Sequence, residues 1–120
     1  MSTPESAEHG VTFDLATIAQ ELRNEEPYVR EGHTARTLLR ASDLRVVLIA
    51  VRAGSTISEH HANVTAAVHV LSGRIRLQLP DRAVELEAGQ LLVLGPGLAH
   101  DVHAQTDGAF LLTLGWRTGQ

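Results

Sequence analysis

The chain has no cysteine, which excludes disulfides, thiolate metal sites and a cysteine nucleophile. It has no lysine either, so its ten basic residues are all arginines, and they are scattered among fourteen acidic residues for a formal net charge of -4. A mildly acidic chain without a basic cluster has no general attraction for phosphate backbones. We therefore expect no nucleic acid among its partners.

The apolar runs of the chain are short, and none approaches the roughly 20 residues that a membrane helix needs. The polar start, residues 1–10, lacks the basic segment and the apolar stretch of a signal peptide. We expect no membrane association and a cytoplasmic location. Aromatic residues make up only 3% of the chain and hydrophobic residues 43%, which predicts a single aliphatic core in these 120 residues.

The N-terminal third predicts one short helix. Apolar residues follow helical spacing over residues 13–25, Asp14 is a plausible N-cap, and Pro27 stands just beyond the expected end. We divide the chain accordingly into a flexible tail with a short amphipathic helix over residues 1–33 and a β-rich domain over residues 34–118.

From about residue 33 the pattern changes to short β-rich runs separated by turn signals such as Pro80-Asp81 and Gly95-Pro96-Gly97. Turns at roughly 8–12-residue spacing are typical of an all-β sandwich or barrel. A parallel sheet would need helical segments between the runs, and the sequence has none there. We predict an all-β antiparallel jelly roll or closed barrel. The predicted strands cover residues 34–41, 44–52, 64–71, 74–79, 83–86, 91–94, 99–103 and 110–116.

Histidine is the unusual feature of the composition. Five of the seven histidines lie between residues 60 and 103, at His60, His61, His69, His100 and His103. We assign no role to the other two, His9 and His33.

Two segments of the β-rich part carry the most specific pattern. The first runs from Gly54 through His60-His61-Ala62 and closes with Val70-Leu71-Ser72-Gly73; the second runs from Gly89 through Gly95-Pro96-Gly97 to His100. Together they resemble the two motifs of the cupin family: G, five residues, H-x-H, three or four residues, E, six residues, G; and G, five residues, P-x-G, two residues, H, three residues, N. The resemblance covers about residues 36–116 and implies a jelly-roll β-barrel. The positions in register are Gly54, His60, Gly73, Gly89, Gly97 and His100.

The departures from the motifs bear on function. Where the family has the second histidine, the glutamate and the asparagine, this chain has Ala62, Ala66 and Ala104, and the proline of the second motif is displaced to Pro96. Of the four usual metal ligands that the resemblance implies, only His60 and His100 are in register.

A divalent first-row metal needs three or four donors that converge from different strands, so a third ligand must come from elsewhere. His61 could supply it if a β-bulge shifted the register by one residue. His69 or His103 could also supply it if the alternation broke in a similar way. On unbroken alternation, His69 points away from the face of position 66, and His103 and Asp101 point away from the face of His100. Glu59 could be a ligand or a base, but a glutamate before a strand is more often solvated.

Two functional hypotheses follow. In the first, His60, His61 and His100 bind a divalent metal (Fe, Mn, Ni or Zn) in a pocket that takes a small molecule, as in a metal-dependent oxygenase or isomerase of cupin type. In the second, the chain is a non-catalytic small-ligand-binding or sensor cupin whose metal site was lost when alanines replaced the donors. With either one, the resemblance implies a homodimer.

Overall fold

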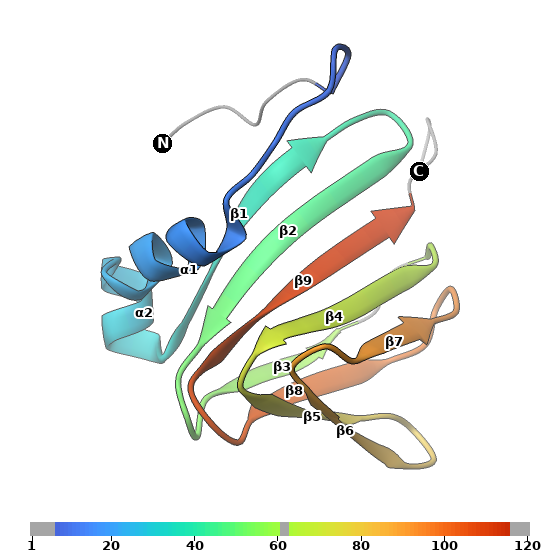
Figure 1. The fold of residues 1–120 in the computed structure, drawn as a ribbon. Coiled ribbons are helices and arrows are strands. Elements are labelled where there is room, and N and C mark those ends of the chain that lie inside the picture. The colour runs from blue at the N-terminus through green and yellow to red at the C-terminus, as the bar shows by residue number, and fades with distance from the viewer. Residues whose placement is uncertain (1–6, 61–62, 116–120) are drawn as a thin grey trace.

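The computed structural model describes residues 7–60 and 63–115, with only the backbone at positions 59 and 60. Within this part, two short helices precede nine strands (Figure 1). The helices are α1 (Leu15–Arg23) and α2 (Glu26–Glu31). The strands are β1 (His33–Arg40), β2 (Leu44–Val51), β3 (Thr56–His60), β4 (Ala66–Ser72), β5 (Arg74–Gln78), β6 (Ala83–Glu87), β7 (Leu91–Leu94), β8 (His100–Ala104) and β9 (Gly108–Gly115).

The strands form two antiparallel sheets, which confirms the predicted antiparallel jelly roll. The larger sheet has the order β1-β2-β9-β4-β7 and the smaller one β3-β8-β5-β6. Strand β9 therefore lies in the centre of the larger sheet, paired with β2 on one side and with β4 on the other. No helix in the described ranges is long and apolar enough to cross a membrane.

The N-terminal region differs from the prediction because it holds two helices instead of one. Asp14 caps α1 as expected, and its side chain accepts a hydrogen bond from the Thr17 amide at 3.2 Å. Pro27, expected to follow the end of the helical region, lies instead in the first turn of α2, where its missing N–H leaves no intrahelical bond unmade. Gly32 ends α2 with a φ of 88°.

Two clusters of buried side chains stabilise the fold. The first lies between the two sheets and is almost entirely aliphatic, with Phe110 as its one aromatic side chain. The second lies between the helices and the outer face of the larger sheet, where Leu22 of α1 and Leu48 of β2 are completely buried. The helices thus pack mainly on β1 and β2 (Figure 1).

Candidate functional site

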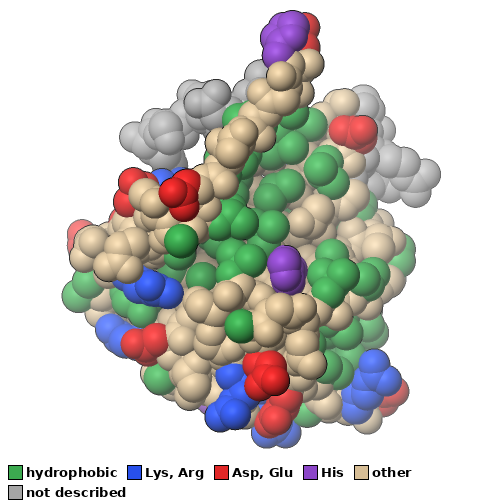
Figure 2. Space-filling model, in the orientation of Figure 1, with side chains coloured by type: hydrophobic (Ala, Val, Ile, Leu, Met, Phe, Trp, Pro, Cys, Tyr) green, Lys and Arg blue, Asp and Glu red, His purple; other side chains and the backbone are tan. Residues whose placement is uncertain are grey.

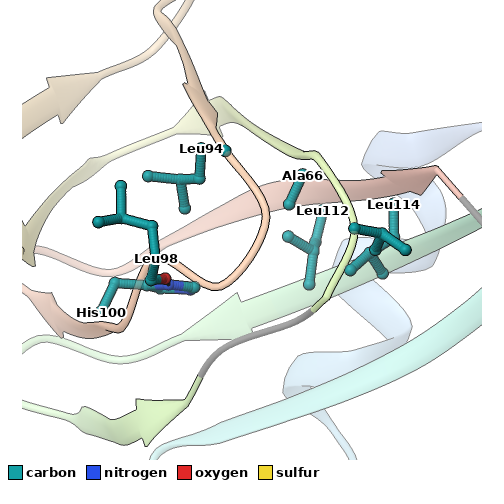
Figure 3. Close-up of a pocket in the computed structure, with 8 residues that line it drawn as sticks. Ala66, Leu94, Leu98, His100, Leu112 and Leu114 are labelled. Atoms are coloured by element: carbon teal, nitrogen blue, oxygen red, sulfur yellow. The ribbon is translucent and has the colours of Figure 1, made fainter.

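A small cavity lies between the two sheets, and its described lining is aliphatic except at one residue (Figure 3). Its volume is about 30 Å³, which is room for one or two water molecules. Among the described lining residues, His100 supplies the one ionisable side chain. The lining residues are Val64, Ala66, Leu94, Gly95, Leu98, His100, Leu112 and Leu114.

His100 is the first residue of β8 and is only 5% exposed. Its Nδ1 lies 3.2 Å from the carbonyl oxygen of Leu98. A carbonyl oxygen can only accept a hydrogen bond, so this contact places the proton of a neutral imidazole on Nδ1 and leaves Nε2 with the lone pair. A histidine that ligates a metal through one ring nitrogen usually donates a hydrogen bond from the other. The geometry of His100 is therefore suitable for ligation of a metal through Nε2.

A β-bulge determines which residue of β3 faces His100. The register runs Thr56 with His103 and Ile57 with Val102, then shifts so that His60 pairs with His100. Without the shift, Glu59 would be the partner of His100. Directly paired residues of antiparallel strands lie on the same face of the sheet, so the bulge brings positions 60 and 100 to one face.

The bulge was predicted to bring His61 to the inner face, whereas the observed register shift lies between Ile57 and His60 and changes the partner of position 60. His61 and Ala62 lie outside the described residues, so the assignment of His61 stays a prediction.

The alanines at the other family positions are buried. Ala66 lines the cavity and is 5% exposed, and Ala104 at the end of β8 is 1% exposed. A methyl group cannot coordinate a metal, so Ala66 adds an apolar group to the cavity wall. Among the described residues, no three histidine or acidic side chains come together in a way that could hold a metal ion.

His69 and His103 lie on the outer faces of the sheets, as the strand alternation predicted. Along β4, Ala66, Val68 and Val70 are buried between the sheets, and His69 lies on the opposite, outer face. His103 is exposed on β8, where its Nδ1 lies 2.9 Å from Thr56 Oγ1. Asp101 lines the same surface hollow as His103.

Most of the cavity lining was not singled out from the sequence. Leu112 and Leu114 are the inward residues of β9, and the alternation of that strand is their only sequence signal. Leu98 follows Gly97, and its backbone carbonyl contacts the His100 ring. Alternation says which residues face inward, but not where the two sheets separate enough to leave a space.

Comparison with known proteins now identifies the fold family. The cupin domain profile matches residues 45–114, which is more than half of the chain. This protein belongs to the cupin family. A search of the curated proteins finds no match to the cupin chain.

Several solved structures share this cupin fold. A conserved protein of unknown function from Streptococcus pyogenes is 25% identical, with a TM-score of 0.75 over 99% of this chain and 98% of its own. A cupin 2 conserved barrel domain protein from Leptotrichia buccalis is 23% identical, with a TM-score of 0.72 over 86% of this chain and 47% of its own. A mutant of salicylate 1,2-dioxygenase from Pseudoaminobacter salicylatoxidans is 17% identical, with a TM-score of 0.74 over 87% of this chain and 34% of its own. The cupin fold is thus shared with an enzyme and with a protein of unknown function.

Proposed function

We propose that this cupin binds a divalent transition metal (Fe, Mn, Ni or Zn) at the cavity, with His60, His61 and His100 as ligands, and that a small molecule binds beside the metal. The observation that carries the proposal is the pairing of position 60 with His100 on neighbouring strands. The Nδ1 contact of His100 with the Leu98 carbonyl supports it, because this contact orients Nε2 as the electron-pair donor.

The donor set decides how strongly such an ion is bound. The described residues supply one imidazole, and alanines stand at two of the family's donor positions. The site therefore suits a metal when positions 60 and 61 supply the other two nitrogens, and a three-nitrogen site leaves coordination positions open for a ligand. A bound ion would act as a Lewis acid toward an oxygen of the small molecule, as in an oxygenase or an isomerase.

A specific observation favours a second candidate function. Among the described lining residues, His100 is the one polar side chain, and Ala66 makes the wall more apolar than the family's glutamate would at this position. Such a wall suits an apolar group of a small ligand, with His100 as the polar anchor. In this case the protein is a metal-free binding or sensor cupin.

The experiment uses the protein without a histidine tag. The protein is dialysed against Zn²⁺, Mn²⁺, Ni²⁺ or Fe²⁺ and then against metal-free buffer, and the bound metal is measured by mass spectrometry. We expect about one equivalent of one metal per chain, falling at least about tenfold in His60→Ala and His100→Ala. His103→Ala is the matched control, because it removes an imidazole from the outer face of the same strand and should leave the metal content unchanged.

The two functions give opposite results in this experiment. Less than about a tenth of an equivalent after loading with every metal would contradict the metal site. The second function then predicts no change of melting temperature with metals or EDTA, and a rise with small apolar acids or alcohols that is lost in His100→Ala.

A further inference from the structure

A hollow of about 340 Å³ lies on the outer face of the larger sheet, between α1, the end of β4 and the start of β9. It is much larger than the cavity beside His100, whose volume is about 30 Å³. Figure 2 shows the side of the molecule that carries α1, with hydrophobic side chains gathered beside the helix. Pockets for small molecules have volumes of about 300–1,000 Å³, so the hollow is large enough for a small organic ligand.

The floor of the hollow is apolar. It consists of Leu15, Ala16 and Ala19 on α1 and of Leu71 and Ala109 on the sheet. All of these except Ala16 also belong to, or pack against, the cluster of buried side chains between the helices and the larger sheet. A ligand that covers this floor removes apolar surface from water, which is favourable in proportion to the area. The hollow therefore suits a ligand with an apolar chain.

Arg23 supplies the one charged group in the described lining. Its Nη1 donates to Gln20 Oε1 at 3.3 Å, which is a long hydrogen bond. Its Nε is buried without a hydrogen-bond partner, and no carboxylate in the described ranges forms an ion pair with its guanidinium. Buried N–H groups rarely lack an acceptor. Arg23 therefore has donors left for an anionic group.

The charge and the apolar floor lie along one face of α1. Leu15, Ala19 and Arg23 follow one another at intervals of four residues, so their side chains share a face. From Leu15 to Arg23 this face extends about 12 Å along the helix axis. Long side chains on a helix lean towards its N-terminus, and the contact of Arg23 with Gln20 shows that its guanidinium does so. The guanidinium thus lies next to the apolar floor.

We propose that this hollow binds a free aliphatic monocarboxylic acid of medium chain length. The carboxylate accepts hydrogen bonds from the guanidinium of Arg23, and the apolar chain lies on the floor towards Leu15. Gln20 and Ser72 add an amide and a hydroxyl group to the lining, and both groups can donate to a carboxylate.

The position of Arg23 favours a singly charged acid over a phosphate. Arg23 lies in the last turn of α1, where the free carbonyl groups of a helix disfavour anions. One guanidinium can bind one carboxylate through two parallel hydrogen bonds, whereas a phosphate dianion brings a second negative charge to the same helix end. The site is separate from the proposed metal site, because the cavity beside His100 is too small for such a chain.

A titration of the full chain, labelled with ¹⁵N, tests the proposal by amide chemical shifts. The probes are butanoate, hexanoate and octanoate. We expect saturable shifts at Leu71, Ala109 and the residues of α1, with a dissociation constant for octanoate of about 1 mM or lower. Affinity should rise about three- to fourfold with each added methylene group, because each one buries more apolar surface. Octylammonium has the same chain with the opposite charge and should bind at least about tenfold more weakly than octanoate.

Two pairs of variants locate the ligand. Arg23→Glu should reverse the preference, so that octylammonium binds more tightly than octanoate. Arg30→Glu is its matched control, because Arg30 is exposed in the last turn of α2 and does not line the hollow. Ala16→Trp fills the hollow and should weaken octanoate at least about tenfold, whereas Val29→Trp changes an exposed position on α2 and should not. Unchanged melting curves by circular dichroism would show that each variant is folded.

The remaining outcomes count against the proposal. Octanoate that produces no saturable shifts up to about 10 mM removes the site, since the apolar floor alone should give tighter binding. Equal affinities for octanoate and octylammonium remove the role of Arg23, and full binding in Ala16→Trp places the chain elsewhere. Octanoate should bind His100→Ala as it binds the wild type. Loss of binding in that variant would assign the acid to the inner cavity, whereas absence of bound metal leaves this site unaffected.

Discussion

His60 and His100 are directly paired positions of β3 and β8, and they come into register through the bulge that follows Ile57. Ala66 lies across the same cavity from His100, on the larger sheet. Both sheets therefore contribute side chains to the cavity wall, and a carboxylate added at position 66 would lie on the same cavity as His100.

Ala66→Glu should raise metal affinity about 10- to 100-fold, because it restores a carboxylate at the position where the family motif has its glutamate. The metal-free variant should be less stable than the wild type, since it buries an uncompensated carboxylate. Calorimetric titration with Zn²⁺ or Mn²⁺ and a melting curve measure both effects. Ala83→Glu, outward and exposed on β6, is the control and should change neither. Equal affinities in the two variants would contradict the metal site.

Arg36 connects β1 to α1 and to the N-cap of α2, with its Nη1 2.8 Å from Glu21 Oε1 and its Nη2 3.0 Å from Glu25 Oε2. Arg36→Ala should lower the free energy of unfolding by about 0.5–1 kcal/mol, the range for partly exposed ion pairs. Arg30→Ala breaks a more exposed pair with Glu26, so urea denaturation should show a smaller loss. A larger loss for Arg30→Ala would contradict this ranking.

The two hydrogen bonds also define a pH dependence. The bond to Glu21 and then the bond to Glu25 raise the pKa of Arg36 above the ordinary arginine value, while burial opposes them. A raised pKa means that the contribution is complete below the ordinary pKa of arginine and is lost only as pH rises through the raised one. The cost of Arg36→Ala should therefore be the same at pH 7 and at about pH 10. A cost that falls between these values would contradict the ion pairs.

Gly73 connects β4 to β5 with a φ of 77°, and an added Cβ there would collide with the backbone of Asp107 and Gly108. Gly73→Ala should cost about 2 kcal/mol or more from backbone strain and the clash together. At Gly95 a Cβ would meet nothing within 4 Å and the φ is not positive, so Gly95→Ala should be close to neutral. Guanidinium denaturation compares the two, and equal costs would contradict the close approach.

Leu22 is fully buried between α1 and the larger sheet. Leu22→Ala should cost about 2–5 kcal/mol, because it leaves a cavity that the surrounding side chains fill only in part. Val29→Ala, which truncates an exposed side chain, should stay within about 0.5 kcal/mol. A cost for Leu22→Ala below about 1 kcal/mol would mean that α1 is not packed against the sheet as described.

Strands with clear hydrophobic alternation could be located closely from the sequence. The strand at Leu91–Leu94 matches residue for residue, and the others among the predicted eight differ by one or two residues at their ends. Strand β3 was missed because Thr56–His60 is mostly polar, and Ile57 is its one apolar residue. Helix α2 was missed because a proline is typical of positions just beyond a helix end, whereas proline is also well tolerated in a first turn, where Pro27 lies.

The candidate site was predictable only where a motif carries it. His100 was identified from the spacing of the second motif, and the structure buries it in the cavity wall. The register of His60 depends on a bulge, and one extra residue in a strand leaves no distinct pattern in sequence.

The central place of β9 has a consequence for how the protein forms during synthesis. Strands β2 and β4 do not pair with each other, and each pairs with β9, which is made last among the described strands. The larger sheet cannot be completed on a nascent chain until residues 108–115 have left the ribosome. Until then, the edges of β2 and β4 that pair with β9 remain unpaired. Contacts this distant in sequence form slowly, and chaperone demand during translation should be highest in the interval before β9 emerges.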